Sequence, residues 1–202
     1  MIDRDRITGI ILCGGAGSRL GGRDKPLEEL DGTPLVEHVR WRLLPQVGRI
    51  VISCNRNADR YARWGDATVS DHQPGLGPLA GILAGMNATT SEYLFVCPGD
   101  APFMPDDLVP QLTTALHRHD AEIAIPNDGT RRQPLFMLIL RSLAPALRAY
   151  VDAGGRDVHG FVEQRCCVEV NLASQADAFA NVNDLADMQA AATTRRNDQR
   201  NQ

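Results

Sequence analysis

Short apolar runs alternate with stretches of helical spacing along most of the chain. The first run, at 7–13, is rich in β-branched residues and predicts a buried strand. Further strands are predicted at 49–54, 67–70, 92–97, 121–126, 133–140, 166–170 and 179–182. Helical spacing predicts helices at 34–44, 57–64, 79–88, 106–119, 142–152, 156–163 and 185–192. Asp128 and Gly129 predict a tight turn before the strand at 133–140.

This alternation predicts an α/β fold, with a mostly parallel sheet covered by helices on both faces and a β-hairpin inserted late in the chain. The 202 residues are 43% hydrophobic, which is enough for one domain with a full core. We expect the domain to span 1–192. The polar stretch 193–202 is predicted to be a disordered tail.

Composition excludes several classes of protein. A formal net charge of −4 argues against binding to nucleic acid or a membrane surface, because such proteins usually carry a basic excess. No apolar run approaches the roughly 20 residues that span a bilayer, and the first residues lack an apolar signal region. Arg40 and Arg42 are predicted on a solvated helix face. The five cysteines have no CxxC spacing, so a zinc site or a disulfide framework is not expected; they are Cys13, Cys54, Cys97, Cys166 and Cys167. Free cysteines of this kind are typical of a reducing compartment, and a cytoplasmic location is expected.

Glycines and cations follow the first predicted strand. Glycine lets successive backbone N–H groups converge on phosphate oxygens, and cations offset the charge. The segment is not a P-loop, because the Lys-Ser/Thr pair is absent, and it departs from the dinucleotide fingerprint, because prolines interrupt the chain before a helix. We favour a polyanion site over a plain surface loop. Its residues are Gly14, Gly15, Gly17, Arg19, Gly21, Gly22 and Lys25.

Polar residues follow three other strands: Asn55, Asp71 and Asp100. Ligands of parallel α/β sheets bind beyond the carboxyl ends of the strands, so these residues are expected near the glycine loop. Asp100, in the sequence PGDAPF, suits either a turn or Mg²⁺, and beside a phosphate loop we favour the metal. Asp71 has the same two interpretations. Asn55 suits either a base or sugar contact or a turn of its own.

Further candidates each have a functional and a structural interpretation. Gly81 belongs to the small residues that open a helix, which either admit a flat base or pack closely against the first loop. The segment 131–133 and Arg156 either face a second anionic substrate or belong to ordinary turns. Asn181 and Asn183 either close the site or cap the last helix.

Several motifs together carry a family resemblance. LCGGAGSRLGGRDK resembles the LAGGxxxRMGxxK signature of nucleotidyltransferases with a Rossmann-like fold, and PGDAPF resembles their PxDxPF metal loop. With GPLAG and NVN in the expected order, the chain resembles the molybdenum cofactor guanylyltransferase (MobA) family from about residue 7 to residue 185. The resemblance implies a three-layer α/β/α sandwich like that of nucleotide-diphospho-sugar transferases. It also implies Mg²⁺-dependent transfer of GMP from GTP to molybdenum cofactor, with release of pyrophosphate.

The resemblance also assigns roles by position. Leu12, Cys13 and Gly14 would contact the nucleotide through their backbone, with Gly15 beside them. Asn55, Asp71 and Gly81 would complete its site. The catalytic residues would be Arg19 and Lys25, on the phosphates, and Asp100, on Mg²⁺. Gln133, Arg156, Asn181 and Asn183 would lie toward the pterin. Departures from the pattern are Cys13 for alanine, Leu20 for methionine, and Asp157, where relatives often have a second cation.

Other functions stay open at this stage. A molybdenum cofactor cytidylyltransferase or a sugar-phosphate nucleotidyltransferase would use the same chemistry with another base or acceptor. A non-catalytic protein that delivers the cofactor is a different class, and Asp100 and Lys25 argue against it. A related dehydrogenase is disfavoured by the broken fingerprint. The expected partners are GTP, molybdopterin cofactor and, transiently, cofactor-biosynthesis proteins and molybdoenzymes. The protein is expected to be a monomer.

Overall fold

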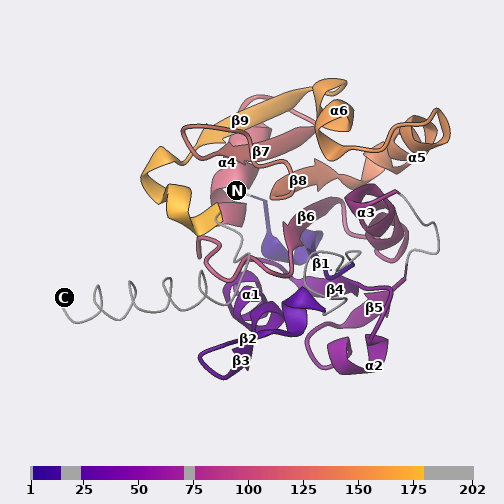
Figure 1. Ribbon diagram of the computed structural model, residues 1–202. Helices are drawn as coiled ribbons and strands as arrows, with labels where there is room; N and C mark the ends of the chain where they lie inside the picture. The colour runs from indigo at the N-terminus through magenta and orange to yellow at the C-terminus, as the bar shows by residue number, and fades with distance from the viewer. Residues whose placement is uncertain (1, 15–23, 71–75, 180–202) are drawn as a thin grey trace.

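The computed structural model describes residues 2–14, 24–70 and 76–179. Within them, one sheet has the strand order β5-β4-β1-β6-β8-β7-β9 (Figure 1). Neighbouring strands are parallel except β8, which runs antiparallel to both β6 and β7. The strands are β1 (Ile7–Leu12), β4 (Arg49–Ser53), β5 (Ala67–Val69), β6 (Tyr93–Pro98), β7 (Ile123–Asn127), β8 (Met137–Leu140) and β9 (Cys167–Asn171).

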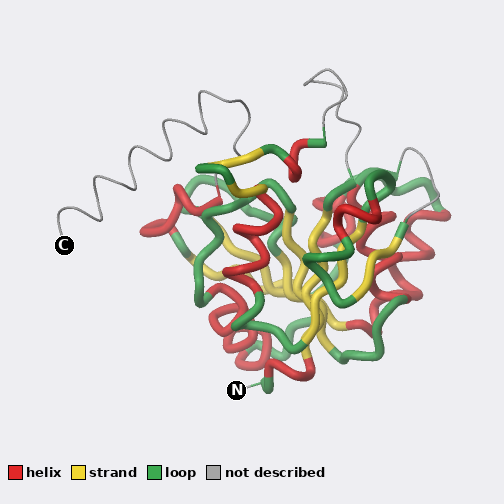
Figure 2. The backbone as a smooth tube through the Cα atoms, turned by 90° about the horizontal axis from the view of Figure 1, so that it is seen from below, coloured by secondary structure: helices red, strands yellow, loops and turns green. Residues whose placement is uncertain are grey.

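Helices lie on both sides of this sheet, which gives three layers (Figure 2). The α-helices are α1 (Leu35–Leu43), α2 (Ala58–Tyr61), α3 (Pro78–Asn87), α4 (Leu108–Arg118), α5 (Ala144–Asp152) and α6 (Val158–Glu163). Shorter elements are the 3₁₀ turns η1 (Arg4–Arg6), η3 (Lys25–Leu27), η4 (Arg141–Leu143) and η5 (Ala173–Phe179), and the small ribbon of β2 (Glu29–Leu30) and β3 (Thr33–Pro34). In the described part of the chain, no helix has the length and apolar character that crossing a membrane requires.

The core has one half on each face of the sheet. Adjacent strand residues point to opposite faces, so Ile11 packs with α1 and α4 while Ile10 packs with α3. Both isoleucines are fully buried. This double burial explains why the central strands are continuous apolar runs rather than alternating ones.

Helix α3 approaches the sheet closely because it carries glycine on its inner face. A Cβ at Gly85 would come within 2.3 Å of Ile10 Cδ1, and one at Gly81 would come within 2.6 Å of Ser53 Oγ. Nothing larger than hydrogen fits at either position without movement of the helix or of the facing side chain. Gly81, the last residue of GPLAG, therefore serves helix–sheet packing. The first loop, on which it was expected to pack, falls largely outside the described residues, at 15–23.

The predicted fold class is confirmed, with corrections to individual elements. The helix expected at 57–64 is limited to α2, and the strand expected at 133–140 begins only at Met137. A turn replaces the first part of that strand: Gln133 N still donates to Pro126 O of β7, but Phe136 N then donates back to Gln133 O, and Pro134 has no N–H to continue the pairing. Phe179 belongs to η5 and not to a strand. The predictions for 180–182, 185–192 and 193–202 lie outside the described residues.

Candidate functional site

The carboxyl ends of β1, β4 and β6 meet at one edge of the sheet. Leu12, the last residue of β1, is in register with Ser53 on one side and Pro98 on the other. Chain direction then brings Gly14, Asn55 and the residues after Pro98 to the same edge. The N-terminus lies at the opposite edge, at the bottom of Figure 2. These residues therefore lie at the carboxyl edge of the sheet, as the order of the strands predicted.

Lys25 and Asp100 are in direct contact at this edge. Lys25 Nζ lies 2.7 Å from Asp100 Oδ2, and each side chain is 20% exposed. Partial burial reduces screening by water, so this pair is held more firmly than an ion pair on an open surface. One cation and one carboxylate, 75 positions apart in sequence, thus form a single polar unit.

The backbone beside this pair is partly committed to the fold. Cys13 N donates to Ser53 O at 2.8 Å, and Gly99 N donates to Leu12 O at 2.9 Å. A Cβ at Gly99 would lie 2.6 Å from Cys13 Sγ, so only glycine allows the Asp100 loop to approach β1 this closely. Gly14, by contrast, is exposed. Of the three consecutive positions predicted for backbone contact, Gly14 is the one most accessible to a ligand.

Asn55 joins the ends of two strands next to Gly14. Its Oδ1 accepts a hydrogen bond from Ser70 Oγ at 3.0 Å, which ties the end of β4 to the end of β5. Its Nδ2 lies 3.8 Å from the place where a Cβ on Gly14 would be. The structure therefore brings Asn55 and Gly14 together, as the order of the strands predicted.

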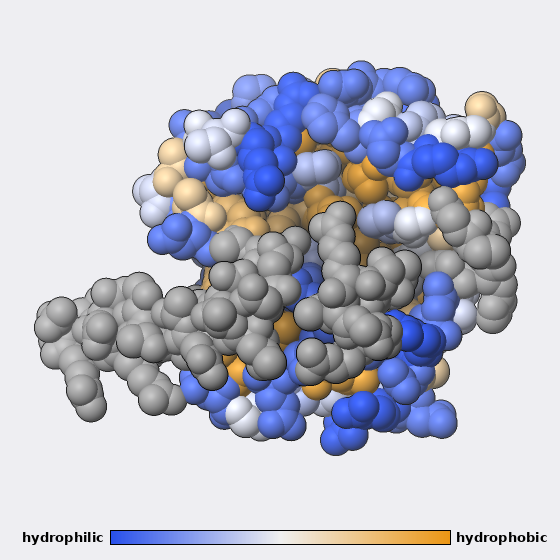
Figure 3. Space-filling view, in the orientation of Figure 1, coloured by the Kyte–Doolittle hydropathy of each residue, from blue (hydrophilic) through white to orange (hydrophobic). Residues whose placement is uncertain are grey.

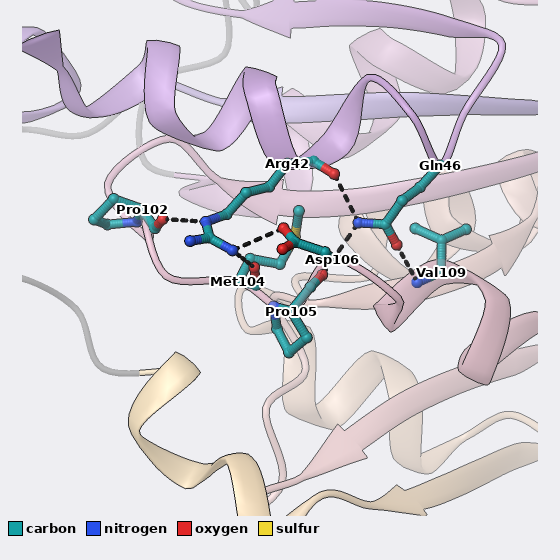
Figure 4. Close-up of polar contacts among 7 residues, drawn as sticks. All are labelled: Arg42, Gln46, Pro102, Met104, Pro105, Asp106 and Val109. Atoms are coloured by element: carbon teal, nitrogen blue, oxygen red, sulfur yellow. Dashed lines mark hydrogen bonds and ion pairs between the residues drawn. The ribbon is translucent and has the colours of Figure 1, made fainter. Parts of the chain in front are cut away.

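The loop that carries Asp100 is fastened to α1 (Figure 4). Arg42 donates to Pro102 O at 2.8 Å and to Met104 O at 3.3 Å, and it pairs with Asp106 at 2.7 Å. Its side chain is only 23% exposed, so the prediction of a solvated helix face is wrong for Arg42. The carbonyls of the loop after β6 come close enough to α1 to accept its guanidinium.

Gln46, in the turn that follows α1, completes this attachment (Figure 4). It is 5% exposed. Its Nε2 donates to Arg42 O and, at 3.1 Å, to Pro105 O, and its Oε1 accepts from Val109 N at 2.8 Å. The last bond satisfies an N–H in the first turn of α4, which has no partner within its own helix. We call Arg42 and Gln46 the α1 brace.

Asp24, the residue before Lys25, is held by α2. Asp24 Oδ1 accepts from the Tyr61 hydroxyl at 2.7 Å, and Oδ2 accepts from Asn57 Nδ2 at 2.8 Å. Burial, together with Cys13 and the bond to Asp24, raises the pKa of Tyr61 far above its usual value, so the hydroxyl stays protonated and donates. We call these three residues the Asp24 clamp.

Three buried thiols lie near this edge, in an environment that makes them unreactive. Cys13, Cys54 and Cys97 are buried and free. Burial raises the pKa of each thiol, which disfavours the reactive thiolate. Among the residues that the structure describes, no group of three or more His, Cys, Asp or Glu side chains is arranged to hold a metal ion.

Gln133 and Arg156 are engaged in local contacts. Gln133 lies at the carboxyl edge, in the loop after β7, where its Nε2 donates to Asp128 Oδ2 at 2.6 Å. Thr130, Arg131 and Gln133 all donate to Asp128 and hold the pKa of its carboxyl far below the usual range. Arg156 lies between α5 and α6 and donates to Val151 O and Gly155 O. No contact joins either residue to Lys25 or Asp100 in the described structure.

The face viewed in Figure 1 has an apolar centre. Figure 3 shows hydrophobic residues gathered across the middle of this face, toward β6 and β8, between two hydrophilic regions. Eight predicted site residues fall outside the described part of the chain: Gly15, Gly17, Arg19, Gly21, Gly22, Asp71, Asn181 and Asn183.

Sequence reasoning missed the Asp24 clamp and the α1 brace. Asp24 stands directly before the predicted phosphate ligand Lys25, so its position was a usable signal. Asn57 and Tyr61 are four residues apart, a spacing that places both side chains on one face of a helix turn. For Arg42 and Gln46 the sequence offers only the same spacing of four, which is equally typical of exposed helix faces.

Comparison with known proteins gives concordant results. A family described as the MobA-like NTP transferase domain matches residues 9–167. A molybdenum cofactor guanylyltransferase from Cupriavidus pinatubonensis is 44% identical over 194 residues, covering 93% of this chain and 97% of that protein. One from Shewanella halifaxensis is 42% identical over 179 residues, covering 88% of this chain and 90% of that protein.

Solved structures extend the likeness of fold further. Molybdopterin-guanine dinucleotide biosynthesis protein A from Archaeoglobus fulgidus superposes with a TM-score of 0.76 at 22% identity, covering 94% of this chain and 99% of that one. A 4-diphosphocytidyl-2C-methyl-D-erythritol synthase from Anaerococcus prevotii gives 0.72 at 13% identity, covering 96% of this chain and all of that one. At these identities the likeness establishes a common architecture and nothing about substrate.

Proposed function

The chain belongs to the MobA-like NTP transferase family, and from this premise we propose that it is a molybdenum cofactor guanylyltransferase. The reaction transfers GMP from GTP to the phosphate of molybdenum cofactor and releases pyrophosphate. The relatives from Cupriavidus and Shewanella support this assignment, because they match nearly the full length of both chains. We also propose that the protein works in the cytoplasm as a monomer.

The contact between Lys25 and Asp100 is the structural observation that carries the proposal. It places a cation and a carboxylate together at the carboxyl edge, beside exposed Gly14. A triphosphate needs positive charge, and a divalent cation needs oxygen ligands. Both requirements are met at one point of the sheet. A protein that only delivered the cofactor would have no need of a carboxylate to hold a divalent cation.

A single carboxylate such as Asp100 is a common type of magnesium ligand in nucleotide-dependent enzymes. Mg²⁺ takes one or two carboxylates, and substrate phosphates and water supply its other ligands. A single partly exposed carboxylate is therefore enough, and a cluster of three protein ligands is not required. When bound, the ion would neutralise charge on the phosphates. The residue proposed to hold it is Asp100.

The residues of the chain would act by position and charge. Attack of a cofactor phosphate on the α-phosphorus brings two anions together, so orientation and charge compensation dominate the barrier. Lys25 Nζ would donate to nucleotide phosphate oxygens and offset charge on the departing pyrophosphate. The exposed backbone at Gly14 and the Asn55 side chain would orient the nucleotide. No protein nucleophile is required.

The remaining assignments are also part of the proposal. Gly15 and Asp71 would complete the nucleotide site, with Arg19 beside the phosphates and Leu12, Cys13 and Gly81 forming its floor. Gln133, Arg156, Asn181 and Asn183 would lie toward the pterin. Arg156 would have to leave the carbonyls of Val151 and Gly155 to reach a substrate.

A nucleotide panel tests the proposal. The purified full chain is mixed with molybdenum cofactor, Mg²⁺ and one of GTP, CTP, UTP or ATP, and pyrophosphate release is measured. We expect release with GTP that depends on the cofactor and stops when EDTA removes the metal. Release with CTP in place of GTP would make the protein a cytidylyltransferase. Binding of nucleotide and cofactor without any release would make it a delivery protein.

A further inference from the structure

Two side-chain donors, one just before α2 and one at its end, form hydrogen bonds with the Asp24 carboxylate. Asn57 precedes α2 and Tyr61 ends it, four positions later, so both side chains reach the same carboxylate. Asn57 adopts φ +55°, a left-handed conformation that asparagine tolerates better than most residues. The helix therefore begins in a way that directs Asn57 Nδ2 toward Asp24. Each carboxylate oxygen receives one donor.

Lys25 is fixed from both sides as a result. On one side, the clamp holds the residue immediately before it. On the other, Leu27 N donates to Asp24 O and Glu28 N donates to Lys25 O, each at 2.9 Å, and close the turn η3. With its backbone held, the Lys25 side chain extends to Asp100. The origin of the lysine side chain is thus set by Asn57 and α2, on the far side of Asp24 from Lys25.

We propose that Asp24 is a positioning residue, which Asn57 and Tyr61 hold so that Lys25 is correctly placed for the nucleotide phosphates. This inference rests on the proposed function for its kinetic consequence. Asp24 touches neither substrate nor the reacting atoms and acts through Lys25. Its loss lowers transfer because a displaced ammonium group no longer matches the charge that develops on the phosphates.

A purely structural role for the clamp has different consequences. Tyr61 is fully buried, packs in the core and meets the Trp64 ring edge-on at a centroid distance of 6.0 Å. Removing only its hydroxyl leaves this packing intact. The Tyr61 hydroxyl also interacts with Cys13, so an effect on Lys25 that Tyr61→Phe shares with Asp24→Asn reports the bond to Asp24 rather than the core.

The sequence supplies a direct probe, because Lys25 is its single lysine. Reductive methylation with ¹³C-formaldehyde labels this side chain and the chain's amino terminus, and Lys25→Arg identifies which NMR signal belongs to Lys25. Methylation preserves the positive charge. The chemical shift and width of the Lys25 signal then report the surroundings of Nζ without any need for activity.

The test compares Tyr61→Phe and Asp24→Asn with the control Tyr93→Phe. Tyr93 is also a buried tyrosine, and its hydrogen bond to a carboxylate, that of Glu92, is at the opposite edge of the sheet. We expect both clamp variants to move or broaden the Lys25 signal and to lower kcat/KM for GTP about 10-fold, as misplacement of a binding group does. Tyr93→Phe should do neither.

A double variant establishes the route. In a Lys25→Ala background, Tyr61→Phe should cause no further loss of kcat/KM, because the residue through which the clamp acts is gone. Additive losses, or clamp variants with the same Lys25 signal as Tyr93→Phe, would overturn the inference. If the parent chain releases no pyrophosphate from GTP, the proposed function fails, and the NMR comparison still decides whether the clamp positions Lys25. Asp24→Asn serves if Tyr61→Phe does not fold.

Discussion

Lys25 and Asp100 meet at one point, but the loops that carry them are held in different ways. The Lys25 side depends on one carboxylate, Asp24, with two side-chain donors. The Asp100 side is held by the α1 brace, whose two residues reach three loop carbonyls and one helix N–H. The side-chain attachment of the Lys25 side converges on one charged group, beside the backbone bonds that close η3, whereas that of the Asp100 side is spread over several backbone groups.

The difference indicates how each side responds to change. A backbone attachment shared by several bonds loses only a part when one donor is removed, although buried carbonyls left without donors destabilise the fold. A clamp on one carboxylate loses its function when that group changes. We therefore expect the Lys25 side to be sensitive in catalysis, and the Asp100 side to be sensitive mainly in stability.

The largest effect is expected from removing the carboxylate at the centre of the comparison. Asp100→Ala should lower turnover by about 10³-fold or more at saturating Mg²⁺ and GTP, because the proposed metal loses its protein ligand. Steady-state pyrophosphate release measures this, and circular dichroism checks the fold. Asp152→Ala, an exposed acid at the end of α5, is the matched control. Near-normal turnover in Asp100→Ala would remove Asp100 from the proposed site.

A smaller effect is expected at the cation. Lys25→Ala should lower kcat/KM for GTP by about 10²-fold, since one charged donor to the developing phosphate charge is lost. Lys25→Arg should recover only part of this loss, because the guanidinium is larger and planar. Binding titration with GTP separates weaker binding from slower transfer. Unchanged values for both in Lys25→Ala would exclude the proposed role of Lys25.

The smallest catalytic effect is expected at the brace. Arg42→Met keeps the aliphatic packing but removes the donors to Pro102 O and Met104 O, and should cost about 1–3 kcal/mol of unfolding free energy. Thermal unfolding should then begin several degrees lower, while kcat below the transition changes little. Arg40→Met on the same helix is the control. A large loss of kcat without loss of stability would show that the two sides of the site are not held differently.

Much of the fold follows from local pattern. The runs at 7–13, 49–54 and 92–97 are continuous and apolar, and they became β1, β4 and β6 because strands buried on both faces need such residues. The edge that brings Gly14, Asn55 and Asp100 together follows from the shared direction of those strands. The strand at 133–140 was predicted too long, because the turn that Phe136 N closes on Gln133 O is a local bend that the apolar pattern does not reveal.

The sequence alone determined which residues are proposed to carry the chemistry, because glycines, a cation and an acid after buried strands are local features. Only the tertiary structure decided how those residues are held. Asp24 meets Tyr61 across 37 positions, and Arg42 meets Pro102 across 60. Such contacts depend on how close two separately formed elements come when helices pack on a sheet, and a single sequence contains no record of that distance.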